Sequence, residues 1–239
     1  TGGSRITLPS ATSYDESATG QSQYRYLRAD GAGSRIELPN VTSVVGRGWY
    51  NDRVFIEALS GGVVDLRSVT EISSVQNSDW GHNGYQNIEV TANGAGSLVR
   101  LDALTRFSDP VGADNDWWLY SRLRAVNSGE VRAPNLTTLS GVSVILDETG
   151  VLPVSQIESL VSGRVELSGG REASFSSLLT ATDTDVDVSG GGVFEAPVLT
   201  AIDAMSLVAT GGSRITLPSA TSYDESATGQ SQYRCLRAD

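Results

Sequence analysis

Several side chains on which catalytic and metal sites depend are scarce in this sequence. Its 239 residues include no lysine, one methionine, one histidine (His82) and one cysteine (Cys235). A single cysteine excludes a disulfide framework within the chain. The lone histidine and the absence of lysine leave few bases for acid–base chemistry. No stretch of 18 apolar residues occurs, so we expect no membrane span.

Positive charge is scarce as well. The 17 basic residues stand against 28 acidic residues, which gives a net charge of −11. Nucleic acid is therefore not an expected partner, because binding it requires a basic surface. The 26 glycines and only 4 phenylalanines are typical of a chain rich in β-strands and turns.

A nearly identical repeat links the two ends of the chain. Residues 1–30 and 210–239 differ only at Tyr26 and Cys235, and the offset from residue 1 to residue 210 is 209. We interpret 1–209 as one full repeat and 210–239 as the start of the next. The whole of 1–239 is then expected to be one continuous segment of a longer tandem array.

A shorter pattern recurs inside this repeat. It consists of a hydrophobic residue, any residue, Leu or Ala, often Pro, a turn residue, a second hydrophobic residue and Thr. Its last position forms a column of Thr12, Thr42, Thr70, Thr105, Thr137, Ser155, Thr180, Thr200 and Thr221. Ser155 and Thr180 fit the pattern least well. The column predicts about eight turns of the chain, which we call rungs, in each 209-residue repeat.

The shortest rungs contain about 20 residues and indicate the fold. In 191–210, apolar and polar residues alternate over 193–196, 199–203 and 206–209, which predicts three strands. One rung cannot bury its apolar stripe, so rungs must stack. We therefore predict an all-β, parallel β-solenoid with three strands per rung, coiling right-handed. Leucine-rich repeats are the rival fold, but they require an asparagine position and a helical return segment.

This pattern of glycine corners, Leu-Pro corners and alternating aliphatic residues resembles the parallel β-helix and β-solenoid repeats of large bacterial surface proteins and adhesins. The resemblance covers the whole chain. It implies an extracellular or cell-surface location.

The four long rungs gain their extra residues between the second and third strands, so we expect long loops along one edge. These loops contain all four tryptophans. The candidates for ligand or partner binding are Trp49, Tyr50, Trp80, His82, Tyr85, Trp117 and Trp118. Aromatic residues among acids and amides suit contacts with glycans or with neighbouring fibres. They equally suit packing of the loops onto the solenoid.

Two further kinds of site are candidates. Asp109, Asp114 and Asp116 can supply oxygen ligands to Ca²⁺, although they lack the EF-hand order and are also common turn formers. No other cofactor is expected. Asn40 and Asn135 begin Asn-x-Thr sequons, and so are candidates for glycosylation. Both also suit the rung corner where they fall.

These observations favour a structural role. We expect a building block of an extracellular tandem-repeat fibre whose partners are further copies of itself. The alternative is a glycan-binding adhesin stalk, which has carbohydrate as its partner. A polysaccharide-degrading β-helix enzyme is the third hypothesis, but His82 is isolated and no lysine base exists. Asp183, Asp185 and Asp187 are interpreted as like charges on a solvated strand. We therefore expect no enzymatic activity.

Overall fold

The computed structural model describes residues 3–17, 23–46, 52–75, 87–109, 121–224 and 234–239. Within these ranges the chain forms only strands and turns, without a helix. All paired strands are parallel and belong to four sheets. The all-β parallel solenoid is thereby confirmed, and leucine-rich repeats are excluded because they need helical return segments. No helix long and apolar enough to cross a membrane is present in the described ranges.

The strands group by sheet. One turn of the chain, which we call a coil, typically passes through sheet A or sheet D, then sheet B and then sheet C. Sheet A contains β1 (Arg5–Thr7), β4 (Arg35–Glu37), β7 (Val63–Asp65), β10 (Leu98–Arg100) and β13 (Glu130–Arg132); the later coils replace it with sheet D, formed by β18 (Glu172–Ser174), β21 (Val193–Glu195) and β23 (Arg214–Thr216). Sheet B contains β2 (Ser13–Asp15), β5 (Ser43–Gly46), β8 (Glu71–Ser74), β11 (Arg106–Ser108), β14 (Thr138–Ser140), β16 (Ser159–Val161) and β19 (Thr180–Thr182). Sheet C contains β3 (Tyr24–Asp30), β6 (Arg53–Leu59), β9 (Asn87–Asn93), β12 (Ser121–Val126), β15 (Val142–Leu146), β17 (Arg164–Leu167), β20 (Asp185–Val188), β22 (Ser206–Ala209) and β24 (Leu236–Ala238).

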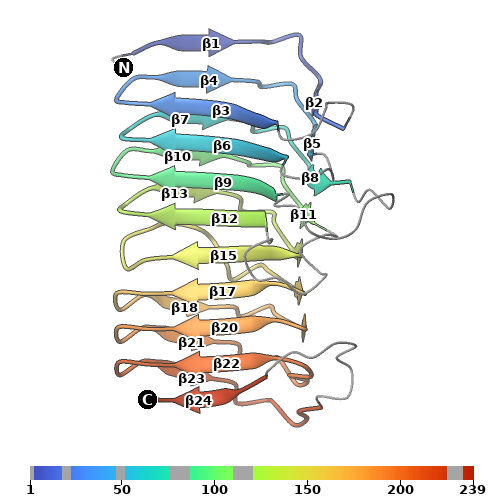
Figure 1. The fold of residues 1–239 in the computed structure, drawn as a ribbon, viewed down its shortest axis with the longest axis vertical. Coiled ribbons are helices and arrows are strands. Elements are labelled where there is room, and N and C mark those ends of the chain that lie inside the picture. Colours follow the sequence, from blue (N-terminus) through green and yellow to red (C-terminus); the bar gives the residue numbers. More distant parts are fainter. Residues whose placement is uncertain (1–2, 18–22, 47–51, 76–86, 110–120, 225–233) are drawn as a thin grey trace.

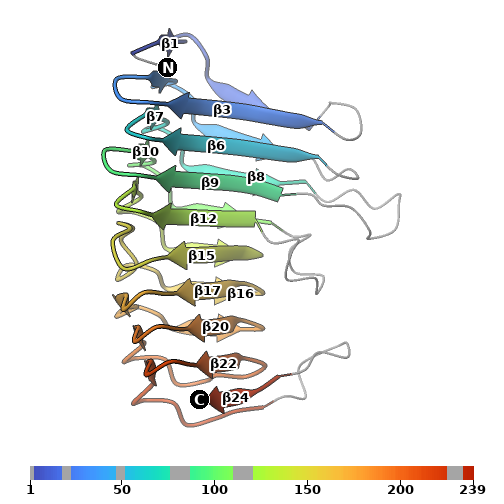
Figure 2. The same cartoon turned by 60° about the vertical axis from the view of Figure 1, so that its left-hand side comes forward.

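We number the coils 1 to 9, so that β1 opens coil 1 and β23 opens coil 9. In Figure 1, sheet A runs behind from left to right, sheet C runs in front from right to left, and the chain descends. The turned view in Figure 2 brings sheet A to the left-hand edge, which agrees with this arrangement. The coil is therefore right-handed, as predicted.

The strand register fixes the length of each coil. Steps from Ile6 to Ile36, Val64, Val99 and Val131 give coils of 30, 28, 35 and 32 residues. Later coils span 21 residues, as from Leu160 to Ala181 and from Phe194 to Ile215. The chain thus returns to the same sequence after eight coils, which confirms the predicted number. With a strand spacing of about 4.8 Å, eight coils rise about 38 Å.

Aliphatic columns fill the interior. One inward column on sheet C consists of Leu27, Ile56, Val90, Leu123, Val144, Val165, Val186, Leu207 and Leu236. The interior phenylalanines pack in two ways. Phe194 pairs in register with the small Ala173, and its ring also contacts that of Phe175, with centroids 5.0 Å apart. Both contacts fill space, which keeps the interior close-packed.

Threonine hydroxyls link successive coils at the corner before sheet B. Oγ1 of Thr42, Thr70, Thr105 and Thr137 donates to the carbonyl of the threonine one coil earlier, at 3.1 to 3.4 Å. The column continues differently from the prediction. The Glu158 amide donates to the Thr137 carbonyl at 2.9 Å, and the Leu179 amide donates to the Glu158 carbonyl at 2.9 Å. Ser155 and Thr180 were therefore the wrong members.

A proline explains this error. In coil 6 the Leu-Pro pair stands two residues early, because Val151 bridges to Glu130 and so places Pro153 level with Arg132 instead of Pro134. In coil 2, Pro39 instead follows strand β4. Proline has no amide hydrogen for the ladder, so coil 6 has only an isolated bridge where the other coils have a strand of sheet A or sheet D.

The coils differ most at the corner from sheet B to sheet C. In coils 1 to 4 this connection contains segments outside the described residues, whereas in coil 5 Gly141 alone separates β14 from β15. Gly141 has a φ of 66°, and a Cβ there would meet the Asp109 carbonyl oxygen at 1.9 Å. Only glycine permits so close an approach. The insertions therefore fall at one edge of the stack, as the sequence predicts.

Candidate functional site

Most of the binding candidates taken from the sequence lie outside the described residues. These are Trp49, Tyr50, Trp80, His82, Tyr85, Trp117, Trp118, Asp114 and Asp116. These residues belong to connections between a sheet B strand and the following sheet C strand. The flanking strands, from β5 to β12, place these connections at the corner between the two sheets (Figure 2). Their roles stay predictions.

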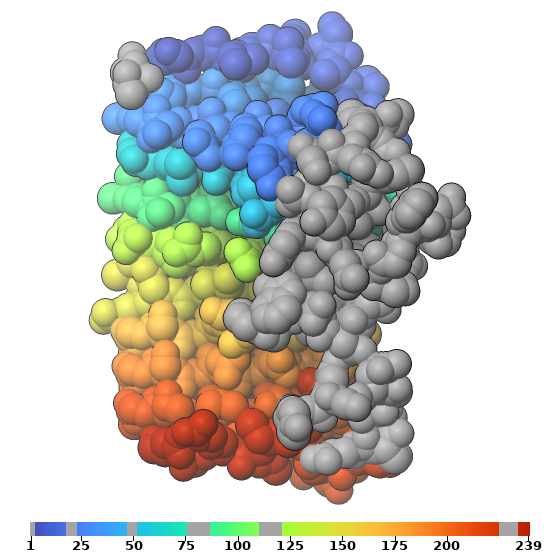
Figure 3. Space-filling model, in the orientation of Figure 1, coloured from blue at the N-terminus to red at the C-terminus, as the bar shows by residue number. Residues whose placement is uncertain are grey.

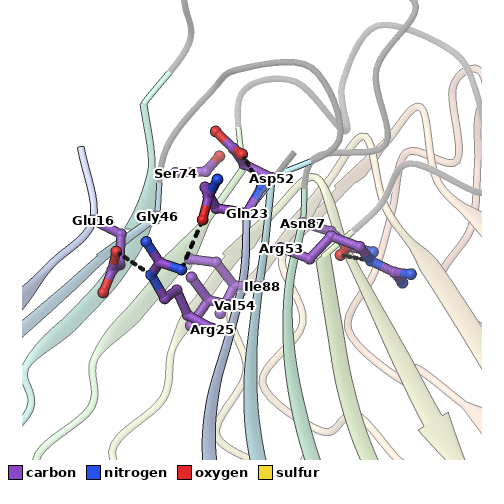
Figure 4. A pocket seen from close by; sticks show the side chains of 10 residues that line it. All are labelled: Glu16, Gln23, Arg25, Gly46, Asp52, Arg53, Val54, Ser74, Asn87 and Ile88. Atoms are coloured by element: carbon purple, nitrogen blue, oxygen red, sulfur yellow. Dashed lines mark hydrogen bonds and ion pairs between the residues drawn. The ribbon is translucent and has the colours of Figure 1, made fainter. Parts of the chain in front are cut away.

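A polar cluster occupies the corner at the first coils (Figure 4). Arg25 points from β3 toward the corner, where Nε donates to Glu16 at 3.1 Å and Nη1 donates to Gln23 at 3.0 Å. The Gln23 amide donates to Oδ1 of the buried Asp52 at 2.7 Å. Burial, reinforced by the nearby Glu16, raises the pKa of the Tyr14 phenol. The cluster therefore joins coils 1 and 2 by hydrogen bonds.

Asp109 is the one calcium candidate that the structure describes. Its carboxylate is fully buried and accepts hydrogen bonds from Ser74 at 2.5 Å and from Ser121 at 2.6 Å. Ser121 Oγ also accepts the Ile88 amide at 2.9 Å. Among the described residues, no group of three or more His, Cys, Asp or Glu side chains could hold a metal. Calcium binding by Asp109, Asp114 and Asp116 stays a prediction.

Both sequon asparagines lie on the surface and take part in the ladder. Asn40 Nδ2 donates to the Pro9 carbonyl at 2.7 Å, and Asn135 Nδ2 donates to the Asp102 carbonyl at 2.8 Å. Each bond reaches one coil back, which is the corner role considered from the sequence. Glycosylation of these exposed nitrogens remains a prediction.

An aromatic patch lies on sheet C, in β3 and β6. We define it as Tyr24, Tyr26 and Phe55. Tyr26 stacks on Phe55 with centroids 4.7 Å apart and planes 9° apart, and Tyr24 meets Phe55 edge-on at 6.2 Å. The guanidinium of Arg28 lies 4.6 Å from the Tyr26 centroid, and that of Arg53 lies 5.0 Å from the Phe55 centroid. The two tyrosines are about half exposed, so the patch can contact a partner.

Coil 9, formed by the repeated residues 210–239, stacks on coil 8, and we call this contact the joint. Phe194 pairs with Ile215 and Leu207 with Leu236, in the same parallel register as other coils. Thr221 Oγ1 donates to the Thr200 carbonyl at 3.4 Å, which continues the threonine ladder. Residues that repeat the sequence of coil 1 therefore follow coil 8 directly.

A buried arginine marks this joint. The side chain of Arg234 is 5% exposed; Nη1 donates to Asp185 at 2.9 Å and Nη2 donates to Asp183. Both acids belong to coil 7, so the arginine reaches past coil 8. Asp187 is paired with Arg164 at 2.7 Å. The interpretation of these three acids as merely solvated like charges is therefore wrong, because each has a cationic partner.

Burial raises the pKa of Asp185 above its ordinary value, and the Arg234 guanidinium offsets only part of that effect. The ion pair alone would lower this pKa, so the cost of removing the carboxylate from water outweighs the attraction. The joint thus contains a buried arginine whose removal would leave Asp185 desolvated without its counter-ion.

Figure 3 shows the side of the stack, with the first coil at the top and the last coil at the bottom. At the first end Ile6 is 55% and Leu8 is 52% exposed, and at the last end Leu236 is 58% exposed. Their equivalents in the interior, such as Val64 and Leu123, are fully buried. The first end forms a hollow lined by Ser4, Ile6, Arg28, Ala29, Asp30, Ser34, Arg35 and Ile36. In this structure the side chains of the first and last coils are therefore more exposed than their interior equivalents.

No family model, no curated protein and no solved structure matches this chain. In the described part of the chain, two features are candidate contact surfaces: the stacking of coil 9 on coil 8 and the aromatic patch.

Proposed function

We propose that this chain is a structural, non-enzymatic building block of an extracellular tandem-repeat fibre. The observation that supports it is the joint. Coil 9 repeats the sequence of coil 1 and stacks on coil 8 with the register of an ordinary coil. The same step can then be repeated indefinitely, because every repeat ends on a surface that fits the start of the next.

The packing also suits a rod. Each interior coil is held to its neighbours by parallel ladders in successive sheets, and the apolar columns continue through the joint as Phe194–Ile215 and Leu207–Leu236. In a repeat stack of this kind stability is approximately a sum over neighbouring pairs. Each added repeat then lengthens the rod without requiring a new type of contact.

Fibre diffraction and electron microscopy of native, full-length material test this proposal. We expect unbranched rods with a meridional reflection near 4.8 Å and an axial repeat of about 38 Å. Rods whose axial repeat differs, or repeats that separate into beads joined by linkers, would contradict it.

A glycan-binding adhesin stalk is the second candidate, and the aromatic patch favours it. Exposed tyrosines beside Arg28 and Arg53 can stack on sugar rings while charged groups bind hydroxyls. Tyr26→Ser should abolish binding to a glycan array. Cys235→Ser, at the same position of the repeated sequence, is the matched control and should change nothing. Equal binding by both variants would exclude the patch as a glycan site.

A further inference from the structure

We propose that the contact between coils 7 and 8 is a hinge, at which the stack bends by opening on the sheet B side while sheets C and D stay paired. This goes beyond the proposed function, because a rod needs no point of bending. Both coils lie inside the stack and have a coil on either side. The contact between them is weak at one corner and complete elsewhere.

The backbone ladder of sheet B stops at this contact. β19 of coil 7 pairs with β16 of coil 6, but within the described ranges no strand of coil 8 pairs with it. In coil 6 the Ser162 amide donates to the Thr182 carbonyl at 2.9 Å, and in coil 8 the Ala204 amide donates to the Asp224 carbonyl at 2.9 Å. Asp183 is the equivalent residue of coil 7, and among the described residues its amide makes no such bond to coil 8.

The turn of the backbone at this corner is the same in all three coils. Ser162, Asp183 and Ala204 follow one another at intervals of 21 residues and have φ values of 47°, 53° and 55°. A different course of the chain therefore does not cause the gap in the ladder. The gap lies between two normally formed corners, so it can widen or close without refolding either coil.

A bond between side chain and backbone is also missing, at the corner before sheet B. Asn135 in coil 5 and Ser219 in coil 9 each donate from the side chain to a carbonyl of the preceding coil, at 2.8 and 2.7 Å. Val198 holds this position in coil 8, 21 residues before Ser219. Valine has no donor in its side chain, so this bond cannot form between coils 8 and 7.

The apolar contact is smallest on the same side. The inward column of sheet B runs in register through Phe107, Leu139, Leu160 and Ala181. Ala181 has the smallest of these side chains and belongs to coil 7. Because apolar attraction grows with the area buried, separation of the two coils loses least here. Ala181 is 2% and Ile202 8% exposed, so the interior is closed in this state.

The other sides of the contact are complete. β18 pairs with β21 through three residues, and β20 pairs with β22 through four. The Ser206 amide donates to the Thr184 carbonyl at 3.1 Å, where sheet C begins. These bonds form the pivot. Opening of the sheet B side therefore tilts coils 8 and 9 relative to coils 1 to 7 and leaves the strands of sheets C and D paired.

Arg234 acts as a strap across the hinge. It belongs to coil 9, and its guanidinium reaches past coil 8 to Asp183 and Asp185 of coil 7. Asp183 stands at the corner where the backbone ladder is missing. A charge-assisted bond at this point holds coil 7 to coil 9 and so limits how far the gap can widen.

The test measures distances across the hinge by double electron–electron resonance on the full 239-residue chain, with Cys235→Ser as background. Nitroxide labels at Arg106→Cys and Ala201→Cys span coils 4 to 8 and include the hinge. Labels at Ser43→Cys and Ser159→Cys span coils 2 to 6 along the same outward column and are the matched pair. Both pairs cover four coil steps, or about 19 Å.

We expect a narrow distance distribution for the matched pair. The distribution for the hinge pair should be about twice as broad and extend to longer distances, because one of its four steps opens. Circular dichroism checks that the labelled chains keep their β-structure. The labelled positions face outward, so the substitutions leave the interior unchanged.

Variants at the hinge test its cause. Val198→Asn restores a donor toward the Ser176 carbonyl, so the distribution of the hinge pair should narrow and the Asp183 amide should exchange about tenfold more slowly, as expected for one added hydrogen bond. Val198→Ala is the matched control and should change neither quantity. Arg234→Gln removes the strap and should broaden the distribution of the hinge pair alone.

Three results would overturn the proposal. The two label pairs can give equally narrow distributions, they can give equally broad ones, or Val198→Asn and Arg234→Gln can both leave the hinge pair unchanged. The second result would indicate general flexibility instead of a hinge. None of them alters the stacking of coils on which the fibre rests, so the two proposals fail separately.

Discussion

Coils 1 and 9 share all but one residue of their sequence but occupy different surroundings. Arg25 in coil 1 pairs with Glu16 at 3.1 Å and has a side chain 37% exposed, whereas its equivalent Arg234 reaches the acids of coil 7 and is 5% exposed. Arg234 is buried because the coils before it bring Asp183 and Asp185 within its reach. The partner of a side chain in this stack is therefore set by the preceding coil as much as by the local sequence.

The largest expected contrast separates interior coils from the end coils. Leu123→Ala should lower the free energy of unfolding by about 3 kcal/mol, because it leaves a cavity at a fully buried site. Leu236→Ala, in the same inward column, should cost less than about 1 kcal/mol because that side chain is 58% exposed. Urea unfolding measures both values, and equal costs would show that coil 9 is covered in solution.

The second contrast compares the two arginines directly. Arg234→Ala should cost about 1–3 kcal/mol of coil 9 stability, because it leaves Asp185 partly buried without its guanidinium. Arg25→Ala should cost about 0–1 kcal/mol, as expected for an exposed ion pair. Hydrogen exchange of the β24 amides reports coil 9 locally, and no change in their protection would exclude a role for Arg234 at the joint.

The pH dependence of folding stability should have opposite signs for Asp147, in coil 5, and for Asp185, at the joint. Burial alone would raise the pKa of Asp147, but hydrogen bonds from the amides of Asn127, Gly150 and Thr149 lower it below the ordinary value. A lowered pKa in the folded state stabilises the fold above about pH 4, and that stability is lost as the pH falls through the folded pKa. The raised pKa of Asp185 acts in the opposite direction, because protonation relieves the cost of its burial.

Acid titration followed by hydrogen exchange can test this difference. Protection near Asp147 should fall below about pH 4, while Asp147→Asn should cost about 1–2 kcal/mol at neutral pH and remove most of that loss. Asp185→Asn is the matched control. In this variant, acidification should not reduce the hydrogen-exchange protection of coil 7. A uniform loss of protection in both regions would contradict the assignment.

The smallest contrast concerns the threonine ladder. Thr221→Val should cost about 0.5–1.5 kcal/mol, because Thr221 donates to the Thr200 carbonyl. Thr12→Val should cost less, since in this structure Thr12 contributes to the ladder through its carbonyl, which accepts from Thr42 and is kept in the variant. Hydrogen exchange of the following amides measures both, and equal effects would indicate that the hydroxyls bond mainly to water.

The fold could be predicted because the inward columns alternate in every coil and depend only on strand period and stacking. Coil 6 could not be aligned, because Pro153 moved its Leu-Pro pair into a strand position and Glu158 replaced the threonine. The burial of Arg234 was also missed. In the sequence, Arg25 and Arg234 are identical polar residues near a strand end. Only the coils stacked beside Arg234 show that it is buried.

The unequal coil lengths have a mechanical consequence. Backbone hydrogen bonds between coils run along the axis of the stack, so tension between its ends loads them one coil at a time. Each detached coil adds about 3.4 Å of contour per residue, which is about 120 Å for the coil from Val64 to Val99 and about 70 Å for the one from Phe194 to Ile215. A single molecule stretched until it unravels would therefore register four long steps and four short ones in every repeat.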